Sequence, residues 1–131
     1  MRTLDRPAGR WGLVAAWVAA NVILSHQPTV PLPGIPGIDK VSHALEYALL
    51  AFLLARAVFP ALRCHPRSQR WAFVVLCCFI YGLGDEIHQA FVPGRSCDPV
   101  DAAADASGAL LLALLLVHLR RKRWVRRAGV D

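Results

Sequence analysis

The sequence predicts an all-α integral membrane protein: a bundle of four transmembrane helices with both termini in the cytoplasm. The chain of 131 residues is 56% hydrophobic and only 18% charged, whereas soluble domains carry about 25% charged residues. Four long apolar segments are separated by stretches that break helices. Basic residues gather at alternate ends of these segments. The length fits a single domain, residues 1–131.

The four apolar segments define the predicted helices as residues 11–25, 41–59, 71–91 and 102–119. Each approaches the roughly 20 residues that a helix needs to cross a bilayer. The separators contain prolines, which cannot continue a helix, as in PTVPLPGIPGID and FPALRCHPRSQR. The first segment follows three arginines, as the apolar part of a signal peptide does, but no small-residue cleavage site follows it. We therefore interpret it as a retained first helix.

Basic residues sort to one side of the predicted membrane. Thirteen of the 15 lie near the N-terminus, around the loop after the second helix, or near the C-terminus: Arg2, Arg6, Arg10, Arg56, Arg63, Arg67, Arg70, Arg120, Arg121, Lys122, Arg123, Arg126 and Arg127. Because lysine and arginine are retained on the cytoplasmic side, both termini are predicted to face the cytoplasm. The basic tail can also bind anionic lipid headgroups. No aromatic or glycine pattern of a nucleic-acid module accompanies it, so no nucleic-acid partner is expected.

Acidic residues sort the opposite way. Seven of the nine lie at or near the extracytoplasmic ends of the last three helices: Asp39, Glu46, Asp85, Glu86, Asp98, Asp101 and Asp105. Polar groups in a bilayer are costly and normally face the bundle interior or a water-filled cavity. Three sets of side chains each share one helix face: Lys40, His43 and Tyr47; Asp85, His88 and Gln89; Asp101, Asp105 and Gly108. The sequence therefore predicts one polar pocket that opens outward.

A structural explanation of these charges stays open. Asp39 could cap the second helix, and Asp98 and Asp101 could be the cap and first-turn acids of the fourth. A salt-bridge network of Arg95 and Lys40 with the acids would satisfy them without chemistry. Ionisable residues within membrane helices are nevertheless functional by default.

Three strings of polar residues follow one another along the chain: Asp39-Lys40-x-x-His43-x-x-x-Tyr47, Asp85-Glu86-x-x-Gln89-x-Phe91-x-Pro93-Gly94-Arg95, and Asp98-x-x-Asp101 with a following Gly108. Together they resemble the VanZ-like family. The resemblance implies a bacterial, multi-pass protein of the cytoplasmic (inner) membrane. The family takes its name from a member associated with teicoplanin resistance, so a link to glycopeptide tolerance is one expectation. Family members often have asparagine at the position of Asp105.

Two functions of different kinds fit the predicted pocket. In an enzyme, His43, Asp85, Glu86 and Gln89 would be the catalytic group, with a general base among them. The substrate-binding residues would then be Lys40, Tyr47, Arg95, Asp39, Asp98, Asp101 and Asp105. Membrane lipids are the expected partners, together with a lipid-linked cell-wall precursor. Alternatively, the same pocket binds an envelope lipid or precursor without catalysis. Transport is disfavoured because the cytoplasmic halves of the helices are almost purely apolar.

No metal site is predicted, and the sequence identifies no cofactor. Metal-ligand spacings such as H-E-x-x-H are absent from the sequence. Asp85, Glu86 and Asp101 are the carboxylates that could hold a divalent cation, because hard cations prefer oxygen ligands. The four cysteines lack paired spacing, which argues against a zinc site and a disulfide framework.

Overall fold

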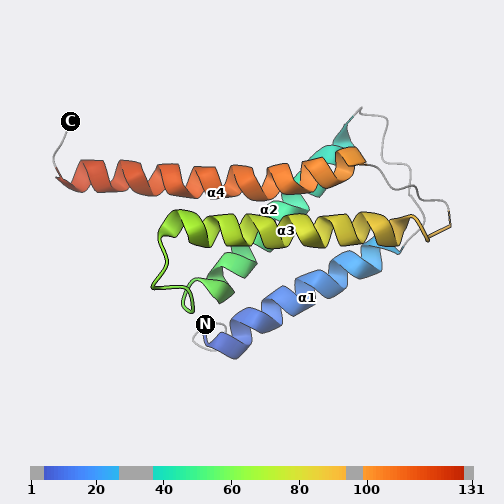
Figure 1. The fold of residues 1–131 in the computed structure, drawn as a ribbon, viewed down its shortest axis with the longest axis horizontal. Helices are drawn as coiled ribbons and strands as arrows, with labels where there is room; N and C mark the ends of the chain where they lie inside the picture. The colour runs from blue at the N-terminus through green and yellow to red at the C-terminus, as the bar shows by residue number, and fades with distance from the viewer. Residues whose placement is uncertain (1–4, 27–36, 94–98, 129–131) are drawn as a thin grey trace.

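The computed structural model describes residues 5–26, 37–93 and 99–128, apart from the side chains of residue 39 and of residues 121–128. It contains four α-helices: α1 (Pro7–Ser25), α2 (Ile38–Val58), α3 (Arg67–Gln89) and α4 (Pro99–Ala128) (Figure 1). Each helix is long and apolar enough to cross a membrane, and the described residues form no strand. The predicted all-α membrane bundle is therefore confirmed in its helix number and class.

Each helix begins three or four residues earlier than the apolar pattern predicts. The first turns are polar, but they favour a helix start. Pro7 lies in the first turn of α1 and Pro99 begins α4, where the missing amide hydrogen costs nothing. Gly37 precedes α2 with a positive φ of 80°. The membrane-spanning part of α4 ends at Arg120, and the helix continues to Ala128 through basic residues of good helix propensity.

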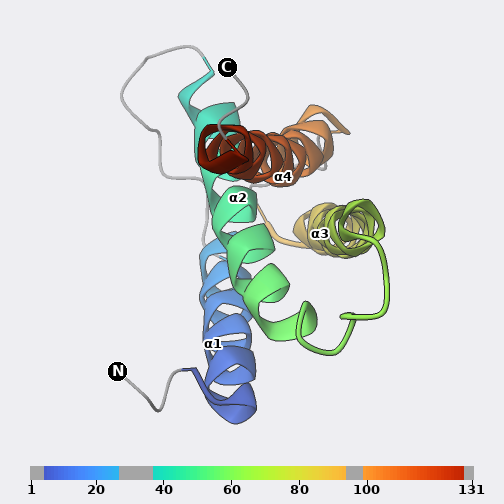
Figure 2. The same cartoon turned by 90° about the vertical axis from the view of Figure 1, so that its left-hand side faces the viewer.

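Helix α2 is the centre of the bundle and contacts the other three helices. Viewed end-on, α1, α2 and α4 form a row with α2 in the middle, and α3 packs on one side of that row (Figure 2). The end of α1, the start of α2, the end of α3 and the start of α4 lie together at one end of the molecule (Figure 1). We call this the polar end, and the opposite end the basic end.

Small residues allow α2 and α4 to approach closely. A Cβ atom built on Gly108 would lie only 1.9 Å from the backbone oxygen of Ala44. Ala51 on α2 and Ala109 on α4 are completely buried in the same core. Small interfacial residues serve this purpose in membrane helices, where dispersion contacts replace the hydrophobic effect.

The outer faces of the helices are apolar. Leu45 on α2, Ile80 on α3 and Leu111 on α4 all expose most of their side chains. Such a surface would promote aggregation in water, but it matches the hydrocarbon of a bilayer. The polar side chains of the helices are left to face one another or the ends of the bundle.

Candidate functional site

Three ionisable side chains from three helices meet inside the polar end. His43 of α2, Glu86 of α3 and Asp105 of α4 each place one nitrogen or oxygen within 4.8 Å of the others. His43 Nδ1 and Asp105 Oδ1 are 3.0 Å apart and form a hydrogen bond. Asp105 is 0% exposed and Glu86 1% exposed. We call these three residues the central cluster.

The surroundings of Asp105 are shaped by a glycine. A Cβ atom on Gly82 would lie 2.8 Å from Asp105 Oδ2 and 3.2 Å from the ring of Tyr47. Gly82 therefore makes room for the carboxylate between α3 and α4. Within the described part of the chain, neither Asp105 Oδ2 nor the Tyr47 hydroxyl has a hydrogen-bond partner. Buried polar atoms without partners lower stability, which favours a functional rather than a structural role for these groups.

A second pair of ionisable side chains joins α2 and α4 one helical turn closer to the polar end. The Lys40 ammonium donates to the Asp101 carboxylate. Lys40 and Asp101 each lie one helical turn before His43 and Asp105, so the two pairs follow one another along the same helix interface. The side chain of Lys40 is 31% exposed and that of His43 16%. The side chain of Lys40 is therefore more accessible than that of His43, which lies deeper between the helices.

Asp85 belongs to a neighbouring group that connects α1 with α3. Its Oδ2 accepts hydrogen bonds from the Ser25 hydroxyl and from Gln89 Nε2, each 2.9 Å long. Beside it, the rings of His26 and His88 lie at the surface with their centroids 5.6 Å apart. Sequence reasoning did not place Ser25 in the site. The available signal was its position, since it is a hydroxyl residue at the same end of the first helix as the acids.

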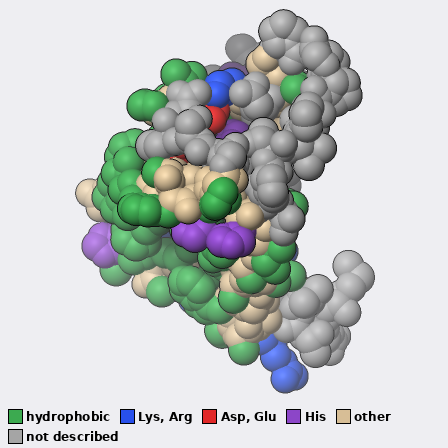
Figure 3. Space-filling model, turned by 90° about the vertical axis from the view of Figure 1, so that its right-hand side faces the viewer, with side chains coloured by type: hydrophobic (Ala, Val, Ile, Leu, Met, Phe, Trp, Pro, Cys, Tyr) green, Lys and Arg blue, Asp and Glu red, His purple; other side chains and the backbone are tan. Residues whose placement is uncertain are grey.

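The structure thus divides the predicted site residues into two neighbouring groups and a set that lies outside the described residues. The central cluster, the Lys40–Asp101 pair and the buried Tyr47 lie together between α2, α3 and α4. Asp85 and Gln89 form the neighbouring group. The remaining predicted residues, Arg95 and Asp98, together with the side chain of Asp39, lie outside the described residues. Figure 3 looks onto this end and shows acidic, basic and histidine side chains gathered among hydrophobic ones.

The carboxylates considered for a divalent cation do not form one group. Asp101 pairs with Lys40, and Asp85 binds Ser25 and Gln89. The residues that do present donor atoms to a shared point are those of the central cluster, a nitrogen and two carboxylate oxygens suited to a first-row divalent metal. The hydrogen bond between His43 and Asp105 accounts for their approach without an ion, and we assign no metal to the cluster.

Comparison with known proteins agrees with the resemblance inferred from the residues. A family model described as VanZ/LLP1 matches residues 7–120. The matched range includes the four membrane-spanning segments and all the described site residues. No curated protein and no solved structure matches the chain.

Proposed function

The chain belongs to the VanZ/LLP1 family, and we propose that it is a membrane enzyme acting on a lipid-linked component of the cell envelope. The observation that carries this proposal is the hydrogen bond between His43 and the buried Asp105. A carboxylate that binds one ring nitrogen fixes the tautomer and orientation of a histidine and stabilises its protonated form. His43 Nε2 is then the nitrogen that accepts a proton from the attacking group.

The accessibility of the polar side chains follows the order that such a reaction requires. Asp105 is buried, His43 is slightly exposed, and Lys40 is the most exposed of the three. A phosphate that approaches from the polar end meets Lys40 first and replaces Asp101 as its partner. His43 then lies one turn deeper, where it can take the proton of a water molecule that attacks phosphorus. The bond from phosphorus to the leaving oxygen breaks, and that oxygen departs with the proton that His43 returns or, from an anhydride, as a phosphate anion.

The position of the site indicates the substrate class. It lies near one end of the membrane-spanning segments, and the helices around it have apolar outer faces. A substrate with a phosphate and a hydrocarbon chain would place each part in a matching environment. We therefore propose hydrolysis of a phosphate ester or anhydride on a polyprenyl or glycerol lipid. A role in glycopeptide tolerance would follow only if that lipid carries a cell-wall precursor.

The experiment that tests catalysis compares two histidine variants. Purified protein in nanodiscs is incubated with polyprenyl diphosphate, polyprenyl phosphate and phosphatidic acid, and released phosphate is measured. We expect turnover of at least one of these lipids, and a loss of about a hundredfold or more in His43→Gln, the effect of removing a general base. His65→Gln is the matched control, because His65 is exposed in the loop between α2 and α3.

Binding without catalysis is the second candidate, favoured by the accessible Lys40 at the rim. Native mass spectrometry of the same proteins separates the two. An envelope lipid retained by wild type and by His43→Gln but lost in Lys40→Ala, with no phosphate released from the panel, would establish a binding protein. Equal turnover in His43→Gln and wild type would contradict the proposed role of His43.

A further inference from the structure

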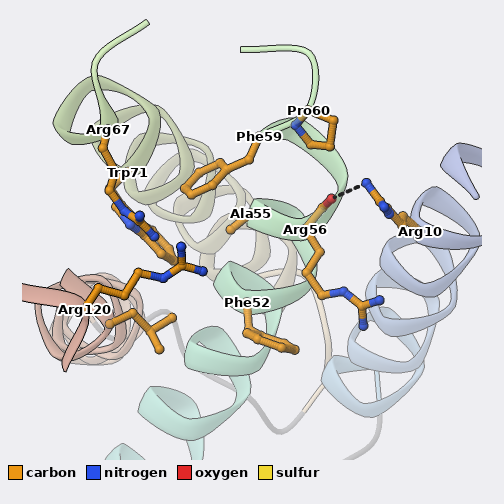
Figure 4. Close-up of a pocket in the computed structure, with 10 residues that line it drawn as sticks. Arg10, Phe52, Ala55, Arg56, Phe59, Pro60, Arg67, Trp71 and Arg120 are labelled. Carbon is orange, nitrogen blue, oxygen red and sulfur yellow. Dashed lines mark hydrogen bonds between the residues drawn. The ribbon is translucent and has the colours of Figure 1, made fainter. Parts of the chain in front are cut away.

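A cavity of about 340 Å³ lies at the basic end, opposite the central cluster. It is lined by the beginnings of α1 and α3, the last two turns of α2 and the end of the membrane-spanning part of α4, and it is partly open to the surface. Each helix contributes one arginine to its lining: Arg10, Arg56, Arg67 and Arg120 (Figure 4). We call this cavity the arginine pocket.

The positive charge of the arginine pocket is only partly compensated. Arg56 donates to the Asp5 carboxylate at 2.7 Å, and Arg10 donates to the backbone oxygen of Arg56 at 3.4 Å. Among the described residues, Arg67 and Arg120 form no salt bridge. The positive charge of Arg120 acts on Arg67 across the cavity. Four like charges around one cavity repel one another, so the pocket favours an anionic occupant.

The sequence offers almost no acid that could neutralise these arginines. Of the acidic side chains that the structure describes, only that of Asp5 lies near these arginines, and it already pairs with Arg56. An anion from outside the chain is the natural partner.

One wall of the arginine pocket is aromatic. The rings of Phe59 and Trp71 meet edge to face with centroids 4.9 Å apart, and both line the cavity. Trp71 Nε1 is buried and has no hydrogen-bond partner among the described residues, so it is a further donor available at this wall. Donors beside an apolar wall suit a ligand that carries both a phosphate and a glycerol or acyl portion.

We propose that the arginine pocket binds the phosphate of an anionic phospholipid headgroup. Arginine presents a planar set of donors that matches phosphate oxygens, and guanidinium groups from different helices can contact several oxygens at once. The pocket lies near the end of the apolar membrane-spanning segments, and in a bilayer the phosphates border the hydrocarbon core. A lipid held there would also link all four helices at the basic end. This site is separate from the one proposed above and does not depend on it.

The test is a titration of the purified protein in neutral detergent with phosphatidylglycerol, followed by native mass spectrometry. Arg67→Gln combined with Arg120→Gln removes two guanidinium groups that form no salt bridge within the described part of the chain. Charge-assisted hydrogen bonds of this kind are strong, so we expect the apparent affinity for the lipid to fall at least about tenfold. Arg63→Gln is the matched control: it removes one charge at the same end from an exposed loop residue that does not line the pocket.

Further arms identify the source of the phosphate and verify folding. Glycerol phosphate and inorganic phosphate are titrated under the same conditions. Saturation by either at the concentrations where the lipid binds would overturn the lipid assignment. Equal weakening by Arg63→Gln, or unchanged binding in the double variant, would overturn the pocket itself. Arg120→Gln alone alters an exposed side chain, and we expect it to keep its helical circular dichroism while binding the lipid more weakly.

Discussion

At the scale of single residues, the burial of Asp105 sets its proposed role against the stability of the fold. Its side chain is fully buried, and within the described residues only one of its two oxygens has a hydrogen-bond partner. A buried carboxylate with an unsatisfied oxygen is destabilising. An asparagine would fill the same space without the charge. The aspartate is thus better explained by what it does to His43 than by packing.

The first prediction at this scale concerns Asp105→Asn. A neutral amide removes the cost of burying the charge, so the free energy of unfolding should be unchanged or higher by about 1–2 kcal/mol. Turnover should fall by about three to four orders of magnitude, because an amide does not stabilise protonated His43. Thermal unfolding in detergent and phosphate release measure the two effects. A markedly lower unfolding temperature with retained turnover would contradict this account.

Helical spacing predicted which side chains share a face, but not how the faces of different helices meet. The spacing of Lys40, His43 and Tyr47 correctly placed them on one side of α2. It could not show that His43 pairs with Asp105 and Lys40 with Asp101. That pairing depends on how α4 is rotated about its axis and shifted along it relative to α2. Ser25 was missed for a different reason: its position at the end of the first helix was the available signal, but a single serine forms no repeating pattern.

At the scale of the elements, the most extensive contact is that between α2 and α4, which aligns both hydrogen-bonded pairs of ionisable side chains. Gly108 lies against the backbone of Ala44, so the two helices touch without an intervening side chain. The pairs of Lys40 with Asp101 and of His43 with Asp105 lie along the same interface. Any change that separates the helices will therefore disturb the central cluster as well as the packing.

The prediction for this interface is that Gly108→Ala is strongly destabilising. The added methyl would overlap the backbone of Ala44, which cannot move aside as a flexible side chain can. Overpacking of this kind costs about 1–3 kcal/mol or more and should lower the unfolding temperature in detergent. Gly84→Ala is the control, since nothing lies within 4 Å of a Cβ there. It should be neutral or stabilising by about 0.5–1 kcal/mol, because alanine favours a helix. Equal effects of the two variants would show that α2 and α4 are not in close contact.

The helices themselves were predictable as elements because apolar length and proline-rich separators are properties of the sequence alone. Their first turns were not, because the polar residues there do not continue the apolar pattern. The continuation of α4 to Ala128 was missed for the same reason. Hydropathy identifies the part of a helix that lies in lipid, whereas backbone hydrogen bonding extends the helix beyond it.

At the scale of the whole molecule, the two ends carry opposite chemistry. Arginines from all four helices surround the cavity at the basic end, while carboxylates and histidines fill the polar end. Most of the positive charge therefore lies at one end of the helices, and most of the carboxylates lie at the other. If lysine and arginine mark the cytoplasmic side, the arginine pocket faces the cytoplasm and the central cluster faces outward.

The two loop cysteines provide a test of that orientation. Cys64 is exposed between α2 and α3, and Cys97 belongs to the segment between α3 and α4. In variants that keep only one of them, a membrane-impermeant maleimide applied to spheroplasts should label Cys97 but not Cys64. Both should react after permeabilisation. The opposite pattern would place the central cluster in the cytoplasm. Hydrolysis of an outward-facing envelope lipid would then be ruled out, because His43 and Asp105 would lie on the wrong side of the membrane to reach it.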